Sequence, residues 1–399
     1  AARRLVAVSP HISAPGSVGG VMGRVVLALI PAIAAYVYYF GPAILFTIVT
    51  AIVAAFAGEA LVLRLRRYPI KPFLLDGSAL VTALLVALSI PPASPWWLTA
   101  SGTLFAIVIA KHLYGGLGSN LFNPAMVGYA VLLISFPSLM TQWPAPLGTA
   151  AMPMGFHDAA TAIFSAGMSQ PMLDAFTMAT PLDTIKTQLL LQKTVSEIST
   201  MPVFGALAGR GGEIIALAYL LGGLYLWRAR VITWHIPAAL LVALFATAAV
   251  FQIVDADRYA SPFFHLAAGG TMLGAFFIAT DPVTGATTPL GKLIFGAAIG
   301  YRAPEFELYN TPLEGRGGRY AEALQIIRPL MEEVMRIRQR ILANQPEIWS
   351  AVEKSAGNGG NPVLSKMVLE FEKFDALIHK IQDAGAQIKD INIGLLDFS

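Results

Sequence analysis

The first 300 residues contain apolar runs about as long as a bilayer is thick, and this feature constrains the fold more than any other. A membrane-spanning helix needs about 20 consecutive apolar residues. Residues 1–300 hold only 25 of the 51 Lys, Arg, Asp and Glu side chains, whereas residues 301–399 hold 26. The sequence therefore predicts an α-helical membrane domain over residues 1–300, followed by a soluble part.

Nine apolar runs are candidate spans, and a long stretch at 137–212, rich in Pro, Thr, Ser and Met, separates the fifth from the sixth. The ninth run has eleven residues and would rise only about 16 Å, half a bilayer. The runs are Val21–Phe40, Pro42–Leu63, Ala79–Ile90, Trp96–Ala110, Pro124–Phe136, Glu213–Trp227, Ile236–Val254, Pro262–Thr280 and Leu290–Gly300.

The basic residues predict the orientation of these spans. With the N-terminus in the cytoplasm, eleven Lys and Arg residues of the membrane domain lie on or near the cytoplasmic side and four lie outside. Cytoplasmic loops are enriched in such residues, so the 137–212 stretch is expected on the outer face. Residues 1–20 lack the apolar core of a cleavable signal peptide.

Two segments in different halves of the membrane domain resemble each other. Each is a short apolar helix with small residues that ends at proline, and the two begin at Asp76 and His265. Five spans precede the outer stretch, so the second copy starts from the opposite side of the membrane. This pattern predicts an inverted repeat of about five helices each, with the second repeat incomplete.

Composition excludes several functions. The chain has no cysteine, which rules out disulfides, thiolate ligation of iron–sulfur clusters and thiol catalysis. The net charge of +3 is too small to indicate nucleic-acid binding. No metal site is expected, because neither His112 nor His265 has a second ligand at helical spacing.

Polar residues at membrane depth are candidates for a site because their burial is costly. Lys111, Asn120 and Asn123 lie in a connection rich in Gly and Asn, and the segment 281–288 is its counterpart in the second half. Such connections can line a cavity or contact a cofactor. The alternative is an ordinary polar loop at the membrane surface.

Three acidic residues could belong to a path for Na⁺ or H⁺. They are Glu59, Asp76 and Asp281, each at or near the end of an apolar segment. They could equally cap helices, and the sequence favours this structural role slightly.

The outer stretch contains the sharpest local feature, at 174–187. Thr180 precedes Pro181, an arrangement typical of an N-cap followed by proline at the first helical position. Leu182, Ile185 and Leu189 then share one face of an amphipathic helix. The free amides and dipole of a helix N-terminus also suit a phosphate group.

Five stretches, in order along about three quarters of the chain, resemble a known family: Asp76–Leu80, Ser89–Pro92, Ala110–Gly118, Phe122–Met126 and Gly274–Thr284. They are similar to the RnfD membrane protein of the Rnf complex (ion-translocating ferredoxin:NAD⁺ oxidoreductase) and to its homologue in the sodium-pumping NADH:quinone reductase.

The resemblance implies a covalent cofactor. Proteins of this family carry FMN joined by a phosphoester to a threonine, which a flavin transferase selects by an Asp-x-x-Ser/Thr-x-Ala-Thr signature. Four residues match the signature: Asp174, Thr177, Ala179 and Thr180. Asp183, three positions after Thr180, is also expected to contribute to the cofactor site. Thr180 is therefore the expected attachment point. Two positions depart from the family pattern: Ala175 stands where the family often has Gly, and Met178 stands where it usually has a small residue.

The resemblance also implies the function. The chain is expected to be an electron-transfer subunit with no independent catalytic activity, coupled to Na⁺ or H⁺ translocation in a bacterial inner membrane. Its expected partners are another flavin subunit, iron–sulfur subunits and the flavin transferase. A second, noncovalent flavin such as riboflavin is expected near Lys111, Asn120 and Asn123. The alternatives are a transporter or channel-like protein and an inactive structural subunit.

The resemblance stops near Gly300, where the family continues the span and adds one more helix. We expect a junction at 301–318 and a soluble helical hairpin at 319–399, which resembles a small uncharacterised bacterial helical domain family and carries no catalytic constellation. A natural fusion, a frameshifted or misassembled gene and a composite sequence all remain open. Both parts look truncated at a point where neither fold is complete, which favours a frameshifted or misassembled gene or a composite sequence over a natural fusion.

Overall fold

The computed structural model describes residues 18–149, 154–165 and 175–304. The chain divides into two compact units, Ala1–Thr311 and Pro312–Ser399, and every described residue belongs to the first. The hairpin predicted at 319–399 and Asp174 of the predicted flavin signature lie outside the described residues.

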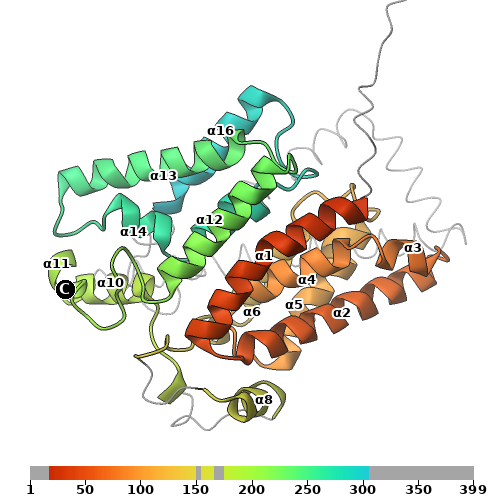
Figure 1. Ribbon diagram of the computed structural model, residues 1–399, viewed down its shortest axis with the longest axis horizontal. Coiled ribbons are helices and arrows are strands. Elements are labelled where there is room, and N and C mark those ends of the chain that lie inside the picture. The colour runs from red at the N-terminus through yellow and green to blue at the C-terminus, as the bar shows by residue number, and fades with distance from the viewer. Residues whose placement is uncertain (1–17, 150–153, 166–174, 305–399) are drawn as a thin grey trace, which may run out of the picture. The chain divides into compact units, whose positions relative to one another are not determined.

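The described part of the chain is helical (Figure 1). Its residues form two isolated β-bridges and no longer ladder. Two of the segments, η1 and η2, are π-helical. In chain order the elements are α1 Val18–Phe40, α2 Ala43–Leu65, α3 Ile70–Leu74, α4 Ser78–Ser89, α5 Trp96–Leu104, η1 Phe105–Leu113, α6 Pro124–Ser135, α7 Pro137–Met140, α8 Phe156–Phe164, α10 Pro181–Leu190, α11 Val195–Ile198, α12 Gly212–Arg228, α13 His235–Val254, α14 Pro262–Ala267, α15 Thr271–Leu273, η2 Gly274–Ile278 and α16 Pro289–Pro304.

Three of the described helices are long and apolar enough to cross a membrane alone. They are α1, α2 and α13, with mean hydropathies of 2.0, 2.2 and 2.2. Helices α4 and α6 are apolar but have only 12 residues each. The predicted all-α, multi-pass membrane architecture is confirmed to this extent.

The eighth predicted span is wrong as a single helix. Pro262–Thr280 is broken into α14, α15 and η2. The break falls at Ala268–Gly270, where Ala268 is extended and Gly269 has a positive φ of 57°. The Thr271 hydroxyl donates to the His265 carbonyl at 2.9 Å and so satisfies one of the acceptors that the break frees.

The ninth predicted run is also longer than expected. Helix α16 has 16 residues and continues past Gly300 to Pro304. It packs along α13, and the small residue at 300 permits a close approach, since a Cβ atom there would lie 2.1 Å from the Leu240 carbonyl oxygen. Tertiary contact with α13 therefore extends a helix that the apolar pattern alone ends too early.

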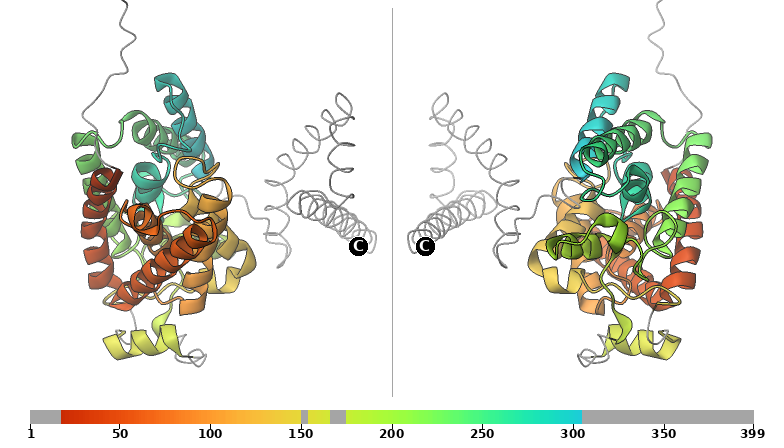
Figure 2. Two further views of the ribbon diagram at one scale, coloured as in Figure 1. Left: turned by 90° about the vertical axis from the view of Figure 1, so that its right-hand side faces the viewer. Right: turned by 90° about the vertical axis from the view of Figure 1, so that its left-hand side faces the viewer.

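The helices pack as two groups that meet at α1. In the first group α2 contacts α4 and α5, and α6 contacts η1; in the second, α13 contacts α14 and α16, and α12 contacts α15. Helix α1 contacts α2 and α4 on one side and α12 on the other (Figures 1 and 2). One buried apolar cluster runs through both groups and includes Leu29, Leu88, Ile107 and Phe276.

Candidate functional site

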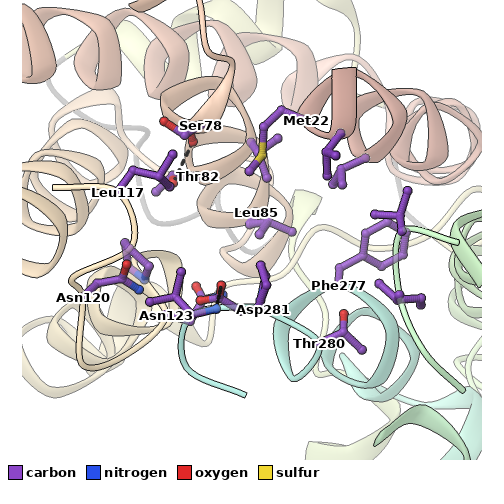
Figure 3. A pocket seen from close by; sticks show the side chains of 18 of the residues that line it. Met22, Ser78, Thr82, Leu85, Leu117, Asn120, Asn123, Phe277, Thr280 and Asp281 are labelled. Carbon is purple, nitrogen blue, oxygen red and sulfur yellow. Dashed lines mark hydrogen bonds between the residues drawn. The ribbon is translucent and has the colours of Figure 1, made fainter. Parts of the chain in front are cut away.

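A cavity of about 130 Å³ lies where the two groups of helices meet (Figure 3). The first group contributes residues from α1, α4, η1 and the connection before α6, and the second contributes residues from α12, η2 and the turn that follows. We call it the central cavity. Its polar lining includes Ser78, Thr82, Lys111, Asn120, Asn123, Thr280 and Asp281.

Lys111 links the central cavity to a buried ion pair. It lies in η1, not in the following polar connection as the sequence suggested. Its Nζ lies 2.7 Å from both carboxylate oxygens of Glu59 and 2.8 Å from the Ser78 hydroxyl. The Lys111 and Glu59 side chains are 3% and 1% exposed. Two opposite charges therefore satisfy each other inside an apolar bundle.

His112 lies on the other side of Glu59. Its Nε2 atom is 3.3 Å from Glu59 Oε1, and its carbonyl oxygen accepts a hydrogen bond from Arg66 Nη1 at 3.1 Å. Glu59 is thus contacted by two basic side chains from η1. The described residues contain no group of three His, Asp or Glu side chains that could hold a metal ion.

Asp76 extends this buried network towards the start of α4. Its Oδ1 atom accepts from the Ser78 amide at 2.7 Å and from the Ser78 hydroxyl at 2.6 Å. Because the Ser78 hydroxyl also accepts from Lys111, Asp76, Ser78, Lys111, Glu59 and His112 form one connected set. Four of the five are buried and Asp76 is half-buried, and we call them the buried polar chain.

Three of the remaining polar residues of the central cavity, Asn120, Asn123 and Asp281, bind backbone groups in turns or at the start of a helix. Asn123 is the N-cap of α6, with its Oδ1 atom accepting from the Ala125 amide at 3.0 Å. The Asn120 side-chain amide donates to the Phe122 carbonyl at 3.0 Å. Asp281 accepts from the Val283 amide at 3.1 Å. In Figure 3 Asn123 and Asp281, from different halves of the sequence, appear on the same side of the cavity.

Thr180 borders a second, smaller cavity of about 70 Å³, which we call the Thr180 cavity. Thr180 is the N-cap of α10, as predicted, with Pro181 at the first helical position. Its Oγ1 atom accepts from the Asp183 amide at 3.2 Å and donates to Asp183 Oδ2 at 2.7 Å. Thr180 is half-buried, so its hydroxyl has a fixed position at the edge of the cavity.

A short antiparallel contact holds the segment before Thr180 in place. Thr177 forms an isolated bridge with Pro144, the Met178 amide donates to the Trp143 carbonyl at 3.0 Å, and the Ala145 amide donates to the Phe176 carbonyl at 2.8 Å. Ala179, Met178 and Trp143 line the Thr180 cavity. Thr177, Ala179 and Thr180 of the predicted signature therefore lie together here.

Several residues of the two cavities were not singled out as site residues by the sequence. Phe40 and Arg210 line the Thr180 cavity from positions far from Thr180 in the chain, and Met22 and Phe277 line the central cavity. Ser78 lies just before the apolar run Ala79–Ile90, within the stretch Asp76–Leu80 that carries the family resemblance, but it was not itself a candidate. Only helix packing brings these residues to their sites, so no local pattern could have indicated them.

The two cavities lie near opposite ends of α1. Met22 lines the central cavity and Phe40 lines the Thr180 cavity. A rise of 1.5 Å per residue separates these two positions by about 27 Å along the helix axis. The cavities are thus separated by nearly the thickness of a hydrocarbon core.

Comparison with known proteins assigns this arrangement to a family. Residues 5–316 match the family described as NQR2, RnfD, RnfE. The chain belongs to this family. The match spans both cavities and every described residue of this NQR2/RnfD/RnfE protein.

Relatives of similar length support the same assignment. A protein of Aeromonas hydrophila subsp. hydrophila is 52% identical over 284 residues, which is 69% of this chain and 81% of its own length. A protein of Shewanella denitrificans is 52% identical over 298 residues, 73% of this chain and 85% of its own. A protein of Vibrio cholerae is 49% identical over 303 residues, which is 74% of this chain and 87% of its own length. All three are named as the D component of an ion-translocating oxidoreductase complex.

Proposed function

We propose that this chain is the membrane subunit of an ion-translocating ferredoxin:NAD⁺ oxidoreductase complex, and that it carries electrons through FMN attached to Thr180. Membership of the NQR2/RnfD/RnfE family supports the first part. The observation that carries the second is the Thr180 hydroxyl, which is held by Asp183 at the edge of a cavity.

The residues around Thr180 fit a phosphoester-linked flavin. The hydroxyl is the nucleophile that such a link requires, and its hydrogen bond to Asp183 Oδ2 orients it. Phe40 and Trp143 provide aromatic walls for a planar ring system. Bound FMN supplies one- and two-electron transfer, while the protein positions and tunes it. Because the chain has no cysteine, its own electron transfer would depend on flavin alone.

The central cavity suits a second, noncovalent flavin such as riboflavin. Phe276 and Phe277 supply aromatic surface, and Lys111, Asn120 and Asn123 supply hydrogen-bonding groups. A ligand there would be in contact with the buried polar chain through Lys111. We also propose that Glu59, Asp76 and Asp281 lie along the path of the coupling ion, Na⁺ or H⁺.

We propose a bacterial inner membrane as the location, with the N-terminus in the cytoplasm and Thr180 on the outer side. The distribution of basic residues supports this orientation, and so does the separation of the two cavities along α1. The other subunits of the complex, including flavin and iron–sulfur subunits, and a flavin transferase are the expected partners.

A transporter or channel-like protein is the alternative function. The broken helix at 262–278 beside a cavity between two helix groups favours it, because transporters build sites at such breaks. The Thr180 cavity favours the redox function, since a channel does not need an oriented threonine at an aromatic-walled site.

Fluorescence of flavin in a denaturing gel tests the proposal. The chain is co-expressed with a flavin transferase as the wild type, as Thr180→Ala and as Thr187→Ala, an exposed threonine on the same helix. We expect fluorescent bands for the wild type and Thr187→Ala and complete loss for Thr180→Ala. A dark wild-type band from correctly inserted protein would instead favour the channel-like alternative.

A further inference from the structure

Arg210 places a cation at the Thr180 cavity that no described residue neutralises. It lines the cavity together with Thr180 and is exposed. Within residues 18–149, 154–165 and 175–304 its guanidinium group makes no ion pair or hydrogen bond. A Cβ atom at Gly148 would lie 3.6 Å from Arg210 Nη1, so the guanidinium lies against the loop that carries Trp143 and Pro146.

A phosphoester on Thr180 would add negative charge beside an existing carboxylate. The Thr180 hydroxyl donates to Asp183 Oδ2 at 2.7 Å, and esterification removes the proton that makes this hydrogen bond. A phosphodiester and a carboxylate would then face each other at short range. Two like charges this close repel each other unless a cation compensates.

The N-terminus of α10 offers little of this compensation. A helix start usually binds phosphate through its free amides. Here Pro181 has no N–H group, the Asp183 amide already donates to Thr180 Oγ1, and the Thr184 amide donates to the Thr180 carbonyl at 2.8 Å. Among the described residues of this turn, Leu182 alone retains an amide with no such partner.

We propose that Arg210 binds the phosphoester of the flavin on Thr180 and so offsets the charge of Asp183; this inference rests on the proposed function. Arginine suits the role because its planar guanidinium group can donate two parallel hydrogen bonds to phosphate oxygens. Among the described residues that line the Thr180 cavity, Arg210 is the cation.

The loop that carries Arg210 is held against the start of α10. The Arg210 amide donates to the Val203 carbonyl at 2.9 Å, and Phe204 pairs with Gly209. Gly209 packs on Pro181, since a Cβ atom there would lie 2.2 Å from Pro181 Cγ. Arg210 therefore has a defined position relative to Thr180.

The test is the rate of flavin attachment at a limiting amount of flavin transferase, measured on full-length, membrane-inserted protein. Four forms are compared: wild type, Arg210→Gln, Arg210→Lys and Arg258→Gln, in which an exposed arginine outside the cavity is changed. We expect the initial rate to fall about threefold or more in Arg210→Gln, to fall less in Arg210→Lys, because lysine keeps the charge but not the two parallel hydrogen bonds, and to be unchanged in the control. The difference between wild type and Arg210→Gln should shrink as ionic strength rises.

Each other outcome overturns the inference. Equal rates for all four forms would mean that Arg210 does not act on the phosphoester. Equal losses in Arg210→Gln and Arg210→Lys would mean that a positive charge at this position does not offset the charge of Asp183. A wild-type protein that takes up no covalent flavin would overturn the proposed function itself, whereas attachment at equal rates in the wild type and Arg210→Gln would overturn only this inference and leave that function standing.

Discussion

At the scale of single residues, the most consequential feature is the ion pair between Lys111 and Glu59. Both side chains are almost completely buried, and both carboxylate oxygens lie 2.7 Å from the ammonium nitrogen. Each charge is tolerated in the apolar bundle because the other is present. The same pair joins the central cavity to Asp76 and His112. A substitution of Lys111 or Glu59 would therefore remove contacts that hold the other members of the buried polar chain in place.

This arrangement predicts that single substitutions destabilise the protein more than a double one. Removing one partner of a buried ion pair costs about 3–5 kcal/mol, whereas neutralising both partners costs much less. We expect Lys111→Met and Glu59→Gln each to lower the thermal midpoint of the detergent-solubilised protein, and the combined variant to recover most of the loss. The midpoint is measured by size-exclusion chromatography after heating.

Lys71→Met, which changes an exposed lysine, is the control and should keep the wild-type midpoint. A double variant that is less stable than either single variant would show that the pair is not the reason for the two losses.

At the scale of elements, the contact between α1 and α12 joins the two helix groups and depends on a small residue. A Cβ atom at Gly222 would lie 2.2 Å from the Ala28 carbonyl oxygen. Small residues at such contacts let helix backbones approach closely in membranes. Residues of both helices line the central cavity, so the spacing of these helices also sets the shape of that cavity.

We therefore expect Gly222→Ala to push α1 away from α12. Overpacking of this kind costs about 1–3 kcal/mol, and the thermal midpoint should fall. Gly23→Ala on α1 is a matched control, because a Cβ atom there meets nothing within 4 Å and alanine favours a helix by about 1 kcal/mol over glycine. Equal midpoints for the two variants would contradict the close contact at Gly222.

At the scale of the whole molecule, the two cavities lie about 27 Å apart along α1 by its rise per residue. This separation, together with the basic loop at 64–71, predicts that the Thr180 and central cavities open towards opposite faces of the membrane.

The absence of cysteine makes this prediction easy to check. Single cysteines replace Lys193, just after α10, and Arg67, just after α2, both of which are exposed. An impermeant maleimide should label Lys193→Cys in intact cells and Arg67→Cys only after the membrane is opened. Labelling of both positions from the same side would refute the orientation, and the unsubstituted chain serves as the control for background.

Local patterns in the sequence were enough to predict several of the helices. The apolar runs placed α1, α2 and α13 within a few residues of their observed ends. The Thr180 N-cap, Pro181 and the buried face of Ile185 were also predictable, because capping and amphipathic spacing act over one or two turns. The family signature further pointed to Thr180 as a site residue.

The assembly of the two sites, in contrast, depends on how the helices and loops pack together. Lys111 and Glu59 are 52 positions apart, Arg210 reaches the Thr180 cavity from another loop, and α16 continues beyond its apolar run because it packs on α13. The break within 262–278 likewise depends on partners outside the segment. Contacts between distant residues leave no periodic trace in a chain, since they are set by which helix faces pack together.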